Sequence, residues 1–219
     1  MPVKTVGLIC AIPEERDALK ATLDHGEATQ IAGLGFSHGE IEGQPIVLAE
    51  AGIGKVNTAM VATLLATRFE VDILAFSGVA GGLDPNLHIG DLVIADRAIQ
   101  HDCGVIENDR LEPYQAGHVP FFNPTDDMGY AARSDMIDSI KAALADLAFP
   151  PLAKDAGGSG DKSTIVYGAI LAGDQYIHCE TTRTRLQARF DAKAVAMEGG
   201  AMAQVAERFG LPWLSLIHI

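Results

Sequence analysis

Residues 71–82 read VDILAFSGVAGG, in which a run from Val71 to Phe76, apolar except for Asp72, is followed directly by Ser77 and a glycine-rich segment. A short apolar run without polar alternation is typical of a strand buried on both faces, as in parallel sheets. Glycine has no side chain to hold a ligand away, so the backbone after this strand can approach one closely. The stretch therefore predicts a buried strand that ends in a ligand-binding turn.

The same order of strand, turn and helix recurs outward from this stretch. Residues 6–11 predict a strand, and helical spacing follows from Pro13. Residues 36–41 and 45–50 predict an antiparallel hairpin, which would make the sheet mixed. Further strands are predicted over 91–99, 164–172, 194–197 and from Pro212 onward, and helices over 56–65, 137–147, 180–190 and 198–209. Residues 1–219 therefore predict a single α/β domain with a central, mixed but mostly parallel sheet flanked by helices.

Ligands of such sheets bind beyond the carboxyl ends of the strands. Three predicted turns gather there: residues 12–15, residues 78–82 and the pair Met197-Glu198. Their convergence predicts a small-molecule site, although it does not specify a reaction. Residues 101–130 follow no regular period, and a loop this long is either a lid or binding loop or an excursion anchored by packed aromatic residues. Residues 154–162, rich in glycine, predict a flexible surface insertion.

Composition excludes several classes of protein. The net charge is −13, from 29 acidic residues against 16 Lys and Arg, and it opposes attraction to nucleic acid or anionic lipid. Cys10, Cys103 and Cys179 are too few and too scattered for a disulfide framework, and no CxxC pair indicates zinc. The apolar run at the amino terminus is too short for a signal peptide or a membrane span. We therefore expect a cytoplasmic protein that binds neither nucleic acid nor membrane.

Four segments occur in an order and spacing that resemble one known family: GLICAIPEER (7–16), AGIGKVNTAM (51–60), FSGVAGGLDP (76–85) with IGDLVIAD (89–96), and VAMEGGAMAQVAERFGLPW (195–213). Over nearly its whole length the chain resembles the 5′-methylthioadenosine/S-adenosylhomocysteine nucleosidases of the purine nucleoside phosphorylase superfamily. The resemblance implies a nucleoside phosphorylase-like fold and hydrolysis of the bond between ribose and adenine, without metal or cofactor. It also implies a nucleoside substrate, a role in methionine salvage, and a homodimer.

The resemblance assigns roles to individual residues. Glu15 matches the acid that holds and deprotonates the attacking water, although without the resemblance it would read as a first-turn acid favoured by the helix dipole. Met197 and Glu198 match a pair that packs against the sugar and accepts hydrogen bonds from two ribose hydroxyls. The alternative for this pair is a core methionine beside a helix-start glutamate.

Further substrate contacts are implied on the base and sugar side, at Ile53, Gly81, Tyr176 and Ile177. Tyr176 would stack on the purine, and its alternative is an ordinary core aromatic residue. Val79 departs from the family's small hydroxyl residue and Ala196 from a common acid, so contacts at those two positions are not carried over.

Hydrolysis is favoured over phosphorolysis, because a carboxylate at Glu15 would repel phosphate. Arg16 and Arg97 leave the alternative of an anion site open. A purine nucleoside phosphorylase and a futalosine hydrolase are the related alternatives, and an inactive nucleoside-binding chain is the alternative from another class.

The family continues its last strand into Arg-Ala-Ile-Ser-Asp, whose aspartate protonates the purine, and then into a terminal helix. Residues 213–219, WLSLIHI, end shortly before that aspartate, and His218 does not match it. A positioned proton donor typically contributes about 10² to 10⁴ in rate, so we expect a carboxyl-terminally incomplete domain with impaired activity. Without the helix we also expect exposed apolar surface.

Overall fold

A computed structural model describes residues 4–158, 160 and 162–219. The strands are β1 (Val6–Cys10), β2 (Asp24–Ile31), β3 (Leu34–Ile41), β4 (Gln44–Glu50), β5 (Ile73–Val79), β6 (Gly81–Gly82), β7 (Leu92–Gln100), β8 (Gly104–Glu107), β9 (Arg110–Pro113), β10 (Tyr130–Ala131), β11 (Ile165–Ala172), β12 (Ala194–Ala196) and β13 (Trp213–His218). The helices are α1 (Pro13–Lys20), α2 (Lys55–Arg68), α3 (Ser134–Leu144), α4 (Glu180–Phe190) and α5 (Gly199–Phe209), with a 3₁₀ turn, η1 (Lys154–Ala156).

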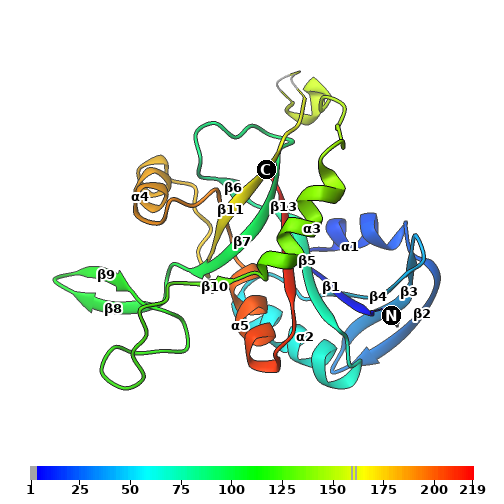
Figure 1. The fold of residues 1–219 in the computed structure, drawn as a ribbon, viewed down its shortest axis with the longest axis horizontal. Coiled ribbons are helices and arrows are strands. Elements are labelled where there is room, and N and C mark those ends of the chain that lie inside the picture. The colour runs from blue at the N-terminus through cyan, green and yellow to red at the C-terminus, as the bar shows by residue number, and fades with distance from the viewer. Residues whose placement is uncertain (1–3, 159, 161) are drawn as a thin grey trace.

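The strands form one mixed sheet in the order β2-β3-β4-β1-β5-β13-β7-β11-β12-β6, with β10 beside β7. Within it β4, β1, β5 and β13 run parallel to one another, and so do β7, β11 and β12. The two blocks meet where β13 pairs antiparallel with β7. The predicted single α/β domain with a central mixed sheet flanked by helices is confirmed (Figure 1).

The sheet closes on itself, which the sequence did not predict. β6 follows β5 after a single residue, Ala80, and pairs with β12 through Gly81 and Val195. Strands β5, β13, β7, β11, β12 and β6 are therefore linked by successive pairings into a circuit, which the covalent connection from β5 to β6 through Ala80 closes. In a flat sheet the antiparallel contact of β13 with β7 would send the carboxyl ends of β5 and β12 to opposite edges. The closure brings them together.

Helices α2 and α5 pack against each other beside the strands. The buried face of α2 consists of Thr58, Val61, Ala62 and Leu65. Two apolar residues whose spacing predicted this helix lie elsewhere, because the side chains of Val56 and Met60 are 79% and 42% exposed. On this helix, apolar spacing indicated the element but not which of its faces is buried.

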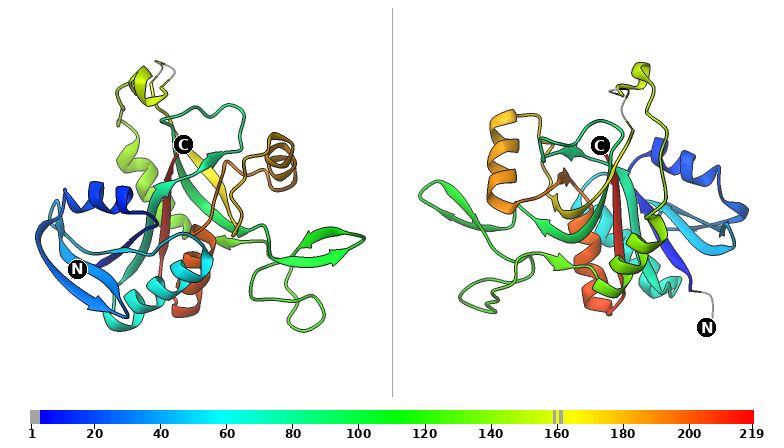
Figure 2. Two further views of the ribbon diagram at one scale, coloured as in Figure 1. Left: turned by 180° about the vertical axis from the view of Figure 1, so that it is seen from behind. Right: turned by 45° about the horizontal axis from the view of Figure 1, so that its top comes forward.

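Several regions differ from the prediction, and the helix predicted over 137–147 begins and ends three residues earlier, at Ser134–Leu144. β2 (Asp24–Ile31) was not predicted, because its sequence, DHGEATQI, has no apolar alternation and its pairing comes entirely from β3. The predicted long loop contains the hairpin β8–β9, which projects on the side of the molecule opposite β2 and β3 (Figures 1 and 2). Phe121 and Phe122 in this region are 90% and 83% exposed, so packed phenylalanines do not anchor it. The predicted insertion contains η1, and its residues 159 and 161 lie outside the described residues.

Candidate active site

The three predicted turns line one cavity of about 360 Å³. It is bounded by the end of β1, the β5–β6 junction, the start of α2, the loop after β11 and the β12–α5 junction. All seven residues assigned to the site from sequence line it: Glu15, Ile53, Gly81, Tyr176, Ile177, Met197 and Glu198. The closed circuit of strands thus gathers residues from near both ends of the chain, such as Glu15 and Glu198.

Glu15 is the third residue of α1, and three backbone N–H groups fix its carboxylate. Oε2 accepts from Ala11 at 2.8 Å and from Ile12, the N-cap residue, at 3.3 Å. Oε1 accepts from Val79 at the end of β5 at 3.0 Å. The side chain is therefore a first-turn helix acid, as the alternative reading held, and it also joins two strand ends at the cavity wall.

Glu198 is the N-cap residue of α5, and its side chain is only 5% exposed. Its Oε1 accepts the backbone N–H of Gly54 at 2.9 Å, and its Oε2 accepts that of Met197 at 2.9 Å. A carboxylate oxygen accepts more than one hydrogen bond, so each oxygen keeps capacity for a ligand hydroxyl. The two fixed bonds set the direction in which the remaining lone pairs point.

Burial raises the pKa of the Glu198 carboxyl above its usual value. The N–H bonds from Gly54 and Met197 act in the opposite direction, whereas the negative charges of Glu15 and Asp174 raise it further. The charge of Glu15 thus acts on Glu198 across one small cavity. A strongly anionic ligand is disfavoured beside them, whereas a neutral polar ligand or one that develops positive charge is favoured.

The rim of the cavity is apolar and open. The side chains of Tyr176, Val79 and Ile53 are 84%, 60% and 56% exposed. Among the residues that the structure describes, Tyr176 stacks only on His178, with ring centroids 6.2 Å apart and planes 13° apart. Because Tyr176 is exposed, the alternative of a core aromatic residue is wrong. A flat aromatic ligand can lie against this rim.

Several residues of the site were missed in the sequence. Gln175, Ala80 and Val195 also line the cavity, and Gly54 contributes the N–H that holds Glu198. Gly54 has φ +99°, which favours glycine, and it stands immediately before α2. Residues 51–60 were recognised in the sequence as one of the segments that carry the resemblance, but the partner of Gly54 across the fold could not be predicted from them.

Neither arginine that left an anion site open lines this cavity. Arg16 donates to Glu50 at 2.6 Å and pairs with Asp17 at 2.8 Å, so carboxylates already neutralise it. Arg97 donates to the carbonyl oxygen of Met128 at 3.3 Å. The cavity walls therefore present two carboxylates and no arginine among the residues that line them.

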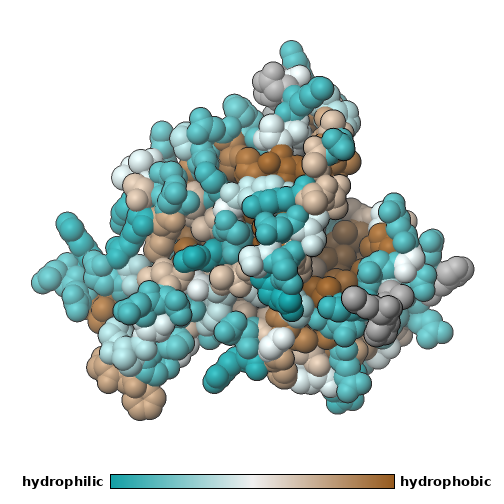
Figure 3. Space-filling view, in the orientation of Figure 1, coloured by the Kyte–Doolittle hydropathy of each residue, from teal (hydrophilic) through white to brown (hydrophobic). Residues whose placement is uncertain are grey.

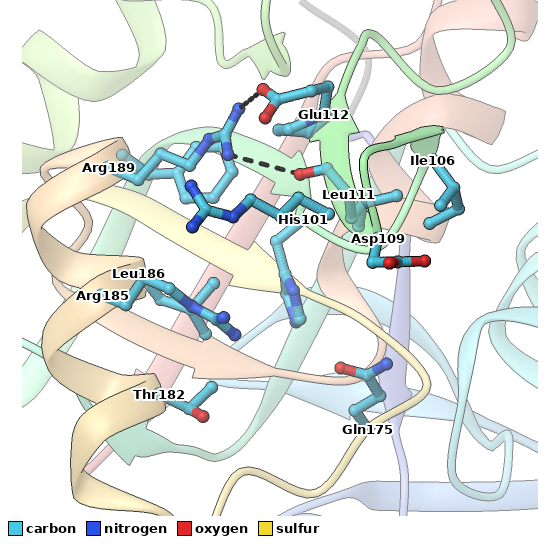
Figure 4. Close-up of a pocket in the computed structure, with 13 residues that line it drawn as sticks. His101, Ile106, Asp109, Leu111, Glu112, Gln175, Thr182, Arg185, Leu186 and Arg189 are labelled. Atoms are coloured by element: carbon cyan, nitrogen blue, oxygen red, sulfur yellow. Dashed lines mark hydrogen bonds and ion pairs between the residues drawn. The ribbon is translucent and has the colours of Figure 1, made fainter.

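A second, larger cavity of about 710 Å³ lies between α4 and the hairpin β8–β9 (Figure 4). Arg185 and Arg189 extend from α4 toward it, and Arg189 donates to Glu112 of the hairpin at 2.6 Å. His101 lies at its base with Nε2 buried and without a hydrogen-bond partner among the described residues, and burial lowers the pKa of this imidazole. Gln175 lines both cavities. Glu15 and Glu198 line only the smaller one, which is where the predicted chemistry gathers.

The chain is similar to known proteins over nearly its whole length. A family model for the phosphorylase superfamily matches residues 5–219. A 5′-methylthioadenosine/S-adenosylhomocysteine nucleosidase of Mycobacterium tuberculosis is 50% identical over 210 residues, which cover 96% of this chain and 82% of that protein. A nucleosidase of this kind from S. pneumoniae, solved with a transition-state inhibitor, is 30% identical with a TM-score of 0.79, covering 97% and 83% of the two chains. A futalosine hydrolase mutant of Helicobacter pylori is 27% identical with a TM-score of 0.78, covering 99% and 89%.

Proposed function

The chain belongs to the phosphorylase superfamily, and we propose that it uses the cavity of Glu15 and Glu198 to hydrolyse adenine nucleosides that carry a 5′-thioether. Its relatives at 50% identity are nucleosidases acting on 5′-methylthioadenosine and S-adenosylhomocysteine, and this chain is likewise a hydrolase of the N-glycosidic bond. The observation that carries the proposal is that these two carboxylates, far apart in sequence, line one cavity with an exposed tyrosine at its rim.

Glu198 binds the ribose in this proposal. Its two oxygens, each of which already accepts one backbone N–H, accept hydrogen bonds from the 2′- and 3′-hydroxyl groups, while Met197 packs against the sugar. The bond from C1′ to adenine loosens with positive charge developing on the sugar ring, as in other glycoside cleavages. A buried carboxylate beside the ring stabilises that charge more than it would in water, because the local dielectric constant is low.

Glu15 activates the water. Its carboxylate accepts a proton from a water molecule whose oxygen forms the new bond to C1′. The electron pair of the broken C1′–N bond passes to adenine, which takes up a proton from solvent as it leaves. The products are adenine and a ribose that keeps its 5′-thioether. The N–H bonds from Ala11, Ile12 and Val79 hold the carboxylate still, so no rearrangement is needed before proton transfer.

Ile53, Gly81, Tyr176 and Ile177 hold the base and sugar in the same proposal. The exposed ring of Tyr176 can stack on the purine, and Gly81 lines the cavity without a side chain, so its backbone can approach the nucleoside. The apolar rim that includes Ile53 suits a thioether rather than a charged 5′-phosphate.

Water is favoured over phosphate as the nucleophile. A phosphate ion in this cavity would lie beside the carboxylate of Glu15 and be repelled by it. Arg16, the next residue in the sequence, and Arg97 on β7 do not line the cavity and so could not offset this repulsion. Phosphorolysis would need cationic groups that the cavity walls do not present.

A homodimer is part of the proposal. Phe121 and Phe122 are 90% and 83% exposed, and hydrophobic side chains gather at the tip of the loop after β9 in Figure 3. Val56 and Met60 on α2 add exposed apolar surface. Such surface is typical of an interface between protein chains.

A cytoplasmic location and a role in methionine salvage complete the proposal. The net charge of −13 and the three scattered cysteines support the location. Among the described residues no helix is long and apolar enough to cross a membrane.

The direct test is chromatographic measurement of adenine released from 5′-methylthioadenosine and S-adenosylhomocysteine, with and without added phosphate. We expect release that is independent of phosphate and lost in Glu198→Ala. Release that requires phosphate would indicate a phosphorylase. Preference for a nucleoside with a carboxylated 5′ chain of the futalosine type would indicate the other relative. Absence of both release and nucleoside binding would overturn the proposal.

A further inference from the structure

Helix α2 begins with a lysine, which is electrostatically unfavourable because the amino end of a helix carries partial positive charge. The ammonium group of Lys55 turns away from the helix and donates to Asp102 Oδ1 at 2.6 Å. Both side chains are largely buried, with exposed fractions of 19% and 13%. Asp102 stands two residues beyond the end of β7. A buried pair of this kind costs desolvation of both ions and calls for an explanation beyond stability.

Two more hydrogen bonds complete a ring. Asp102 Oδ2 accepts the backbone N–H of Asp174 at 2.8 Å, and Asp174 Oδ1 accepts the backbone N–H of Lys55 at 2.8 Å. Asp174 follows β11. The ring therefore ties the ends of β7 and β11 to the first residue of α2. Burial alone would raise the pKa of the Asp102 carboxyl, but Lys55 and the N–H of Asp174 hold it below its usual value.

Two of the segments that bound the nucleoside cavity are attached to this ring. Gly54, next to Lys55, donates its N–H to Glu198 at 2.9 Å. Gln175, Tyr176 and Ile177, which follow Asp174 directly, line the same cavity as Glu198. A Cβ on Gly54 would lie only 3.0 Å from Asp174 Oδ1, so the two segments also approach each other closely at this point. Movement of the ring would move the donor that orients Glu198.

We propose that Asp102, Lys55 and Asp174 form a positioning ring that aims the carboxylate of Glu198 and thereby sets the preference of the site for nucleosides bearing both ribose hydroxyls. The inference rests on the proposed function, since it assumes that Glu198 binds ribose. None of the three side chains lines the nucleoside cavity, so they act through Gly54 and through the loop that carries Tyr176. They are positioning residues and not catalytic ones.

The proposed ring predicts that the variants Lys55→Met and Asp102→Asn lose much of the preference for nucleosides with both ribose hydroxyls. The probe is a C-nucleoside analogue of adenosine, whose carbon–carbon link to the base resists hydrolysis, compared with its 2′,3′-dideoxy counterpart. Calorimetry gives both dissociation constants. The dissociation constant of the dideoxy compound divided by that of the parent analogue measures how strongly the site prefers the ribose hydroxyls that Glu198 binds. We expect the ratio to fall about tenfold or more in both variants, as for loss of well-aimed hydrogen bonds to a charged group. Lys55→Arg keeps the cation and should restore much of the ratio.

Lys193→Met is the matched control. Lys193 forms an ion pair of the same length with Asp84, 2.6 Å, and with similar exposed fractions, 29% and 14%, but it makes no bond to α2. Its loss should lower the melting temperature and leave the ratio unchanged. An unchanged ratio in Lys55→Met and Asp102→Asn, with the wild type discriminating normally, would overturn the ring. A wild type that binds neither probe, or binds both equally, would instead overturn the assignment of Glu198 to ribose. If Asp102→Asn fails to fold, Lys55→Met and Lys55→Arg still decide.

Discussion

Gly54 donates its backbone N–H to the carboxylate of Glu198 across 144 positions of sequence. The donor is the last residue before α2 and the acceptor the last before α5, so the amino ends of two packed helices meet at one carboxylate. Both helix ends favour negative charge there. The contact therefore offsets part of the free-energy cost of burying the ionised carboxylate of Glu198 beside the proposed sugar site.

Gly54→Ala should weaken nucleoside binding and destabilise the fold. At φ +99° a side chain is strained, and its Cβ would lie 3.0 Å from Asp174 Oδ1. We expect a loss of about 1–3 kcal/mol in the free energy of unfolding, measured with denaturant, together with reduced affinity for 5′-methylthioadenosine. Gly43→Ala is the control, because Gly43 has φ +78° but open space around its Cβ position. Equal affinity losses in both variants would contradict a specific role for Gly54.

Glu15→Gln should separate catalysis from binding. The amide cannot take a proton from water, so we expect adenine release to fall by about 10² to 10⁴, as for loss of a general base. Substrate affinity should be retained, because the ribose hydroxyls are assigned to Glu198. The measurement pairs a single-turnover assay of adenine with calorimetric binding. Glu14→Gln, on the exposed side of the same turn, serves as control and should keep the wild-type rate. A Glu15→Gln variant with undiminished release would remove Glu15 from the mechanism.

Local signals explain which elements could be predicted from the sequence. Helix α4 has the predicted bounds, Glu180–Phe190, and β1, β4, β7 and β11 lie within two residues of theirs. In these elements propensity, periodicity and end signals agree. β2 lacks them, because it is a polar edge strand formed by pairing with β3. β6 is two residues long, and only its pairing with Ala194 and Val195 of β12 makes it a strand.

The same distinction applies to the site. Glu15, Met197 and Glu198 were assigned through family resemblance, and the closed circuit of strands gathers them as expected. The ring of Lys55, Asp102 and Asp174 was not predicted, because its bonds join residues 47, 72 and 119 positions apart. Single Lys and Asp residues in loops most often lie on solvated surfaces. Only the fold makes these three a unit.

Removing the exposed phenylalanines should abolish dimerisation. In Phe121→Ser/Phe122→Ser we expect light scattering to give the mass of one chain, 23.1 kDa, where the wild type gives twice that value. Each phenylalanine contributes a large apolar area to an interface, which serine does not replace. Leu147→Ser is the control, since Leu147 is 50% exposed but lies just beyond α3, outside this loop. A wild type that is already monomeric, or a double variant that remains dimeric, would contradict this assignment of the interface.

The raised pKa of Glu198 should appear as a pH limit on nucleoside binding. Only the ionised carboxylate can accept hydrogen bonds from both ribose hydroxyls. Nucleoside affinity should therefore be full at neutral pH and should fall as the pH decreases through the pKa of Glu198, which is raised above the ordinary value of 4.5. Binding stabilises the ionised form, and the carboxyl must therefore release a proton on binding when the pH lies near its pKa. Calorimetry of the adenosine C-nucleoside, in buffers of different ionisation enthalpy across this range, measures both effects. The groups that face Glu198, namely Glu15 and Asp174, both raise its pKa. Glu15→Gln should accordingly move the limit to lower pH, whereas Glu198→Gln should remove it. Affinity that stays constant down to the ordinary pKa of a glutamate would show that the ionised carboxylate does not bind the sugar.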